Sequence, residues 1–184
     1  MEWKNSEQTV FTKNYAYYYD LFYKDKPYDK ECDFVEQIIK QFLKKEGNGG
    51  EGGKEGTPTS ILDLACGTGR HSLLMKQRGY DITGTDFSAD MIAQANKNSQ
   101  KANLNIPFHV MPMQQTNLNK QFDVVMGMFH VFGYLTDYQD IQKMLTQTKQ
   151  HMHNDSILIL DFWNGEEVLR DTWPQKVRIF HDNT

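Results

Sequence analysis

Apolar and polar positions along residues 60–162 predict strands that alternate with helices. Short apolar runs typical of buried strands occur at 60–64, 80–85, 106–110, 122–126 and 156–162. Segments between them place apolar residues three and four positions apart, after Gly69, after Ser88 and over 138–152. The sequence therefore predicts an α/β fold, a doubly wound and mainly parallel sheet.

The first 43 residues predict a helical cap. Tyrosines crowd residues 15–23, and a short amphipathic helix laid on the domain is the simpler interpretation. A lid that closes its tyrosines over a ligand is the second interpretation, and both can hold. Over 28–43 the apolar residues recur at helical spacing and predict a helix that packs on the core through Phe34, Val35, Ile38, Ile39, Phe42 and Leu43.

Residues 44–59 are rich in Gly, Lys and Glu, which predicts a flexible surface linker. The domain expectation is a cap over 1–43, this linker, and a ligand-binding α/β domain over 60–184. The chain has 184 residues, two cysteines and a formal net charge of −4. That balance does not favour a nucleic-acid partner, and no signal-peptide or membrane-spanning pattern is found, so a cytoplasmic protein is expected.

The chemistry is concentrated at the predicted carboxyl ends of the strands. Residues 60–71, S-I-L-D-L-A-C-G-T-G-R-H, predict a buried strand, a glycine turn and a helix start. Gly67 and Gly69 allow a ligand to approach the backbone, and the free amides of the helix favour a polar or anionic group. Asp86 follows the second strand at about the spacing where a carboxylate accepts hydrogen bonds from a ribose diol.

Three motifs together resemble the class I S-adenosylmethionine-dependent methyltransferases. They are D-L-A-C-G-T-G-R-H from Asp63, T-G-T-D-F-S-A-D-M from Thr83, and F-D-V-V-M-G-M-F-H-V-F-G-Y-L from Phe122. Y-A-Y-Y-Y-D-L-F-Y near the start and D-F-W-N-G after the fifth strand resemble the branch that methylates small molecules such as amino sugars and glycine. The resemblance implies S-adenosylmethionine as cofactor and a small-molecule acceptor, with an amine nitrogen favoured.

The resemblance also implies roles for individual residues. By this resemblance, the amino-acid part of the cofactor would lie along Ala65, Gly67 and Gly69 of the glycine loop, and Asp86 would hold the ribose. The adenine would lie between Phe87 and Met113, and Tyr15 would close over the methionine end. Asp63 would brace the loop or reach the cofactor's amino group through water.

Two positions depart from the family pattern. The third motif often carries an acid that bonds the adenine amine, whereas this chain has Met111-Pro112-Met113, so that contact is missing or comes from Gln114. The sugar-modifying members often have a histidine at the position that Tyr134 occupies, and His130 lies four residues earlier.

Methyl transfer to an amine needs mainly positioning, desolvation and a base for the amine's proton. His130 is the first candidate for that base, since imidazole titrates near neutral pH. A histidine merely packed among its apolar neighbours is the equally weighted alternative. Tyr134 is the second candidate, as the group that orients the nucleophile. No metal is expected, because His151, His153 and Asp155 are better explained by an exposed helix end.

Three other functions stay open. A nucleic-acid methyltransferase is disfavoured by the acidic charge and by Met126-Gly127-Met128-Phe129 after the fourth strand. A nicotinamide oxidoreductase is disfavoured by Ser72 at the third fingerprint position. The family resemblance implies seven strands, so the chain is also expected to be short at its end, where 177–180 would begin another strand. The third is a truncated protein that binds the cofactor but has no activity. Its exposed fifth strand would allow a homodimer.

Overall fold

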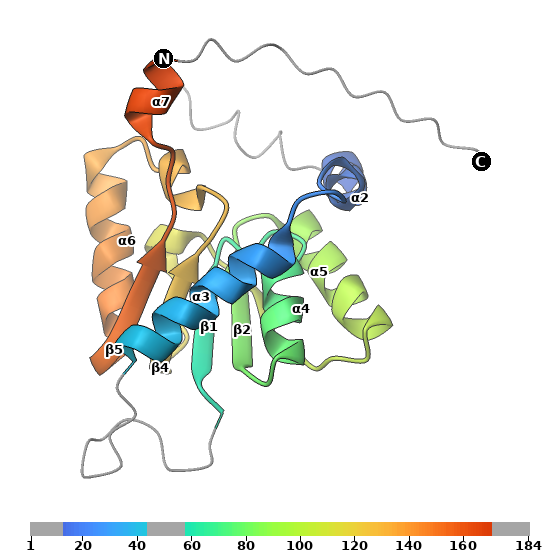
Figure 1. Cartoon of the computed structure of the whole chain (residues 1–184), viewed down its shortest axis with the longest axis horizontal. Helices are drawn as coiled ribbons and strands as arrows, with labels where there is room; N and C mark the ends of the chain where they lie inside the picture. Colours follow the sequence, from blue (N-terminus) through green and yellow to red (C-terminus); the bar gives the residue numbers. More distant parts are fainter. Residues whose placement is uncertain (1–12, 44–57, 171–184) are drawn as a thin grey trace.

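The computed structural model describes residues 13–43 and 58–170, and these form one parallel sheet with helices on both faces (Figure 1). The strand order is β3-β2-β1-β4-β5, and all four pairings are parallel. The order reverses between β1 and β4, so the carboxyl ends of these strands form the switch point where ligands bind in such sheets. The predicted doubly wound α/β fold is confirmed.

The elements follow the predicted alternation closely. The strands are β1 (Ser60–Leu64), β2 (Asp81–Asp86), β3 (Phe108–Val110), β4 (Phe122–Gly127) and β5 (Met152–Leu160). The helices are α2 (Lys13–Phe22), α3 (Tyr28–Phe42), α4 (Arg70–Gln77), α5 (Ala89–Lys101), α6 (Tyr138–Gln150) and α7 (Gly165–Arg170). Two short 3₁₀ helices, η2 (Met113–Gln115) and η3 (Val131–Tyr134), follow β3 and β4.

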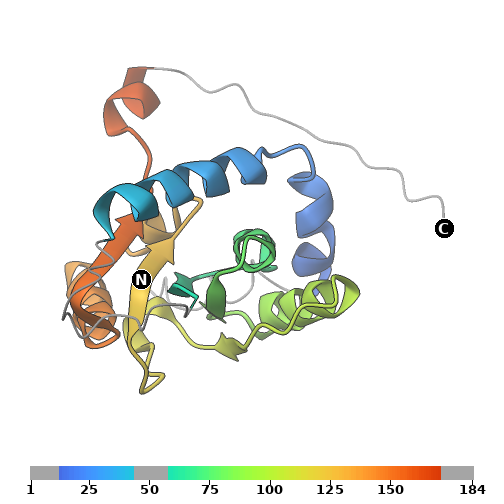
Figure 2. The ribbon, with the colours of Figure 1, turned by 60° about the horizontal axis from the view of Figure 1, so that its bottom comes forward.

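Alternate residues of the central strands enter two separate cores. Ile61 of β1 packs with Val35 of α3 and Met75 of α4 on one face. Leu62 of the same strand packs on the other face with Val125 and with Met144 of α6. Figure 2 shows α3 and α6 on opposite sides of the sheet. Because the sheet is covered on both faces, its central strands read as continuous apolar runs.

Helices α3 and α6 bury a narrower face than the spacing of their apolar residues predicted. In α3 the buried positions are Tyr28, Cys32, Val35 and Ile39, whereas Phe34 and Phe42 are 60% and 57% exposed. In α6 the inward residues include Met144 and Thr148, and Leu145 is exposed. An apolar residue at the edge of a stripe does not by itself reveal whether a neighbouring element covers it.

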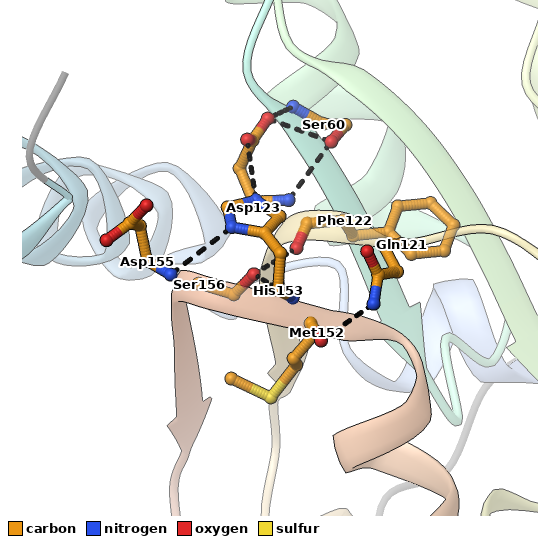
Figure 3. A network of polar contacts seen from close by, with 8 residues as sticks. All are labelled: Ser60, Gln121, Phe122, Asp123, Met152, His153, Asp155 and Ser156. Atoms are coloured by element: carbon orange, nitrogen blue, oxygen red, sulfur yellow. Dashed lines mark hydrogen bonds and ion pairs between the residues drawn. The ribbon is translucent and has the colours of Figure 1, made fainter. Parts of the chain in front are cut away.

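The start of β5 differs from the prediction. The sequence predicted a strand over 156–162, but β5 begins earlier, at Met152, and passes through a register shift against β4. A polar network fills this irregularity (Figure 3). In it the Ser156 hydroxyl donates to the Phe122 carbonyl at 2.6 Å and accepts from the His153 amide at 2.9 Å.

Asp123 ties this network to β1. Its Oδ2 accepts the Ser60 amide at 2.6 Å and the Ser60 hydroxyl at 2.8 Å, and its Oδ1 lies 3.2 Å from His153 Nε2 (Figure 3). Burial alone would raise the pKa of Asp123, but the hydrogen bonds from Ser60 and His153 outweigh it and hold this pKa below its usual value. The carboxylate therefore joins three strands at the amino ends of the sheet.

The helix α2 lies beyond the carboxyl ends of the strands, beside α5 (Figures 1 and 2). Residues 1–12 and residues 44–57 of the predicted linker at 44–59 fall outside the described residues, as does the strand expected at 177–180. Among the described strands, β3 and β5 form the two edges of the sheet. No helix in the described ranges is long and apolar enough to cross a membrane.

Replacing the carboxylate of Asp123 by an amide tests the network at the amino ends. Because its pKa is lowered on folding, the ionised form stabilises the fold above the unfolded pKa, and this contribution is lost as pH falls through the folded pKa. Asp123→Asn should lower the free energy of unfolding by about 1–2 kcal/mol at pH 7. Urea unfolding at pH 7 and pH 3 measures it, and an equal loss at both pH values would contradict the charge-based explanation.

Candidate cofactor site

A cavity of about 910 Å³ opens at the carboxyl ends of the strands, beneath α2. Volumes of this order hold a drug-sized ligand. Its wall brings together nearly all of the residues singled out in the sequence. They are Tyr15, Asp63, Ala65, Gly67, Asp86, Phe87, Met113, Gln114, His130 and Tyr134.

Gly69 is the exception, and the structure explains its glycine differently. Its φ of +80° is in the left-handed region, at the N-cap of α4. A Cβ there would lie 3.0 Å from the Phe108 ring and 3.3 Å from Ala95, so the position faces the core rather than the cavity. Gly67, with φ +56°, has open space where its Cβ would be, and it lines the cavity.

Asp86 fixes the glycine loop against the start of α5. One carboxylate oxygen accepts the Gly67 amide at 2.9 Å, and the other accepts the Ser88 amide at 2.8 Å. Burial raises the pKa of Asp86 above its usual value, and the two amide hydrogen bonds oppose that shift. Each oxygen keeps a further lone pair, so the carboxylate can still accept hydrogen bonds from a diol in the cavity.

Asp63 is buried under the first turn of α4, where the Ser72 hydroxyl donates to it. Burial raises the pKa of Asp63 to about 6, although His71 and Ser72 favour its charged form. The side chain thus ties the end of β1 to the first turn of α4, and its implied role in bracing the loop stays a prediction. Ser72, which argued against a dinucleotide site in the sequence, is the residue that makes this bond.

The wall beyond β2 and β3 combines apolar side chains with two amides. Phe87 is about one third exposed, whereas Met113, in η2, is almost fully buried and also packs in the second core. Gln114 follows it on the cavity wall. Gln115 lines the cavity as well, and apolar side chains with adjacent amides suit a planar heterocycle that carries hydrogen-bonding groups.

The cap helix α2 is held in place by one carboxylate that sequence reasoning missed. Asp20 accepts the Thr68 hydroxyl of the glycine loop at 2.7 Å and the Asn98 side chain of α5 at 2.8 Å. Asn98 also donates to the Thr68 carbonyl at 3.0 Å. The tyrosine face of α2 is thereby turned to the cavity, with Tyr15, Tyr19 and Tyr23 on its wall. The segment is a helix that packs beside α5, and closure of its tyrosines over a ligand stays a prediction.

A second missed network lies below the cap. Glu31 of α3 bonds to Lys26 and lies 2.7 Å from His71 Nε2. Burial would raise the pKa of Glu31, but the hydrogen bonds from His71 and Lys26 hold it below the usual value. The Lys26 ammonium also lies 4.3 Å from the centre of the Phe129 ring. His71, at the first turn of α4, is therefore engaged in positioning α3.

Arg70 faces the cavity from the first position of α4, and Lys143 of α6 is a second cation on the cavity wall. The Arg70 guanidinium lies 5.3 Å from the centre of the Tyr28 ring. The salt bridges found among residues 13–43 and 58–170 give it no carboxylate partner. In the sequence this arginine stands directly after the glycine turn, but sequence reasoning assigned it no role.

His130 and Tyr134 approach the cavity from the segment that follows β4. Phe129 and His130 have φ of +70° and +60°, a left-handed conformation that is costly for residues with a Cβ. Asp161, directly after β5, accepts the amides of both residues, at 3.0 and 2.8 Å. The His130 ring stacks on Trp163 with ring centres 4.2 Å apart. These contacts fix the backbone and the ring of His130, and its role as the base stays a prediction.

The histidines near the end of α6 are also explained by the fold. His151 was expected to be exposed, but it is 2% exposed, accepts the Leu118 amide at 2.9 Å and bonds the Gln147 carbonyl at 2.8 Å. The ring joins the end of α6 to the loop before β4. Within the described residues, no three His, Cys, Asp or Glu side chains form a cluster that could hold a metal.

These features define an α/β protein with a nucleoside-type ligand site at the switch point of its sheet. Residues 61–155 match the methyltransferase domain family, which is about half of the chain. The chain therefore belongs to that family.

Several characterised proteins are similar to it. The dTDP-3-amino-3,4,6-trideoxy-alpha-D-glucopyranose N,N-dimethyltransferase of Streptomyces venezuelae is 25% identical, over 89% of this chain and 63% of the relative. The glycine/sarcosine N-methyltransferase of Aphanothece halophytica is 30% identical, over 67% and 47%. The crystal structure of Streptomyces venezuelae DesVI superposes with a TM-score of 0.68 at 24% identity, covering 81% of this chain and 57% of that one. The chain thus spans about half to two thirds of the length of these relatives.

The raised pKa of Asp63 predicts how stability varies with pH. The folded state holds the proton up to about pH 6 and the unfolded state only to about its ordinary pKa, so stability falls as pH rises between these values. Asp63→Asn keeps an acceptor for Ser72 and removes the buried charge. We expect a gain of about 1–3 kcal/mol in the free energy of unfolding at pH 7 and little change at pH 4. An equal decrease in the free energy of unfolding at both pH values, measured by urea unfolding, would show that the buried charge of Asp63 does not destabilise the fold.

Proposed function

We propose that this chain binds S-adenosylmethionine in the cavity and transfers its methyl group to an amine nitrogen of a small molecule. The observation that carries the proposal is the convergence of Asp86, the glycine loop, Met113 and His130, from four different strand ends, on one cavity. Relatives described as N-methyltransferases of amino sugars and of glycine or sarcosine support the amine acceptor.

In the proposed binding mode, the ribose diol lies on Asp86 and the adenine lies between Phe87 and Met113. Gln114 is the residue placed to bond the adenine edge. The methionine end then lies along Ala65 and Gly67, toward Tyr15. That end carries a carboxylate, and Arg70 is the cation on this part of the wall. Bound cofactor would supply an electrophilic methyl group on a positively charged sulfur.

The chain's own groups serve the transfer by positioning. The nitrogen lone pair forms the new N–C bond while the C–S bond breaks and its electron pair stays on sulfur. Positive charge moves from sulfur to nitrogen without being created, so exclusion of water and alignment are the main requirements. The tyrosines of α2 and the rings of Phe129 and Trp163 form the apolar wall around this point. In this proposal His130 takes the proton from nitrogen, and Tyr134 orients the acceptor.

Two ligands that differ only at the amino-acid end test the two halves of the proposed site independently. S-Adenosylhomocysteine carries the amino-acid end, whereas 5′-methylthioadenosine lacks it. Asp86→Ala should weaken both ligands by roughly ten- to a hundredfold, because both contain the ribose. Arg70→Gln should weaken S-adenosylhomocysteine by a similar factor and leave 5′-methylthioadenosine unchanged. Isothermal titration calorimetry measures each dissociation constant.

Arg78→Gln is the matched control, since Arg78 lies just after the other end of α4 and pairs with Asp33 and Glu36 away from the cavity. It should leave both affinities unchanged. A folded wild-type chain that binds neither ligand would refute the cofactor assignment. Binding without methyl transfer to glycine, sarcosine or amino-sugar nucleotides, followed by mass spectrometry, would favour the inactive, cofactor-binding alternative.

A further inference from the structure

Two consecutive residues in the segment after β4 have left-handed backbone conformations, which residues with a Cβ rarely adopt. Phe129 and His130 both have positive φ, and neither is glycine or asparagine. Such strain persists only where surrounding contacts over-determine the backbone, and it concentrates at functional sites. The contacts that hold this pair therefore indicate what the segment is built to present.

The backbone amides of both residues bond to one side chain. The Asp161 carboxylate receives the Phe129 amide on Oδ2 at 3.0 Å and the His130 amide on Oδ1 at 2.8 Å. Successive amides that converge on one carboxylate fix the backbone between them. The Asp161 amide in turn lies 3.4 Å from the Gly127 carbonyl, at the end of the β4–β5 pairing. The sheet thus delivers the carboxylate to the segment.

The same carboxylate faces the imidazole. Asp161 Oδ2 lies 3.7 Å from His130 Nδ1, an ion-pair distance rather than a hydrogen bond. Nδ1 is buried, and none of the described groups bonds it. The ring as a whole lines the cavity, and Trp163 covers one of its faces at 4.2 Å. With Nδ1 enclosed on the side of Asp161, Nε2 is the nitrogen left for a ligand in the cavity.

We propose that Asp161 is the positioning residue of the methyl-transfer site: it holds the left-handed Phe129–His130 backbone and keeps the His130 proton on Nδ1, so that Nε2 is the base that faces the acceptor amine. The inference rests on the proposed function for the identity of the reaction. When nitrogen is methylated, its proton passes to Nε2, the ring becomes imidazolium, and the Asp161 carboxylate faces the new charge. A carboxylate that orients a histidine in this manner is a recurring catalytic arrangement.

Asp123 provides a matched control within the same chain. It also accepts a backbone amide and faces a histidine, His153 Nε2 at 3.2 Å, but it lies at the amino ends of the strands (Figure 3). Asp161→Asn and Asp123→Asn are therefore the same chemical change in two Asp–His pairs at opposite ends of the sheet. Only the first should alter His130.

The decisive measurement is the imidazole tautomer, which does not depend on turnover. Two-dimensional ¹H–¹⁵N correlation spectra of the whole chain labelled with ¹⁵N-histidine distinguish Nδ1–H from Nε2–H at alkaline pH, where the rings are neutral. The chain has six histidines, and loss of one signal set in His130→Asn assigns this one. We expect His130 to hold its proton mainly on Nδ1 in the wild type and in Asp123→Asn, and to shift toward Nε2–H in Asp161→Asn.

Mainly Nε2–H in the wild-type chain, or an unchanged tautomer in a folded Asp161→Asn, would overturn the proposal. The wild-type spectrum decides the matter even if that variant does not fold. With an active acceptor, Asp161→Asn should lower kcat about tenfold or more while KM for S-adenosylmethionine stays within about threefold. A wild-type chain that shows the Nδ1–H tautomer but binds no S-adenosylhomocysteine would contradict the proposed function and leave the Asp161–His130 pairing intact.

Discussion

The site depends on the bidentate role of the Asp86 carboxylate at the end of β2. By accepting the Gly67 and Ser88 amides, it fixes the loop after β1 relative to the start of α5. The Cys66 amide, bonded to the Thr85 carbonyl at 2.9 Å, extends the β1–β2 ladder to the same point. These hydrogen bonds hold the residues of the glycine loop that have positive φ, so the loop needs no further contact from the cavity side. Everything that α2 and the β4 segment add is built on that fixed loop.

Most of the fold could be predicted because it depends on local pattern. Buried strands such as 60–64 and 122–127, the Ser88 N-cap and the glycine turn all have short-range signals. The errors occur where burial is decided by partners far away in the chain. Phe34 and Leu145 lie at the edge of apolar stripes that no described element covers. The β5 bulge depends on bonds across the strands, from Asp123 to His153 and from Ser156 to Phe122.

The candidate site divides in the same way. Residues that touch the cavity through sequence motifs, such as Asp63, Asp86 and His130, were found because those motifs carry a chemical requirement. Residues that hold the motifs in place were missed, since an aspartate in a helix or after a strand is ordinary. Asp20 lies 48 positions from Thr68, and Asp161 lies 32 from Phe129. No local pattern reports contacts at such separations.

Asp161 has a consequence for the dynamics of the sheet. It extends β5, an edge among the described strands, and its carboxylate covers two amides of a loop that belongs to β4. Transient separation of β5 from β4 would expose those two amides to water together with the last rungs of the ladder. The amide hydrogens of Phe129 and His130 are thus internal reporters of local opening at that edge, readable by hydrogen exchange. In this fold, separation of the edge strand β5 therefore also disrupts the geometry of the site around His130.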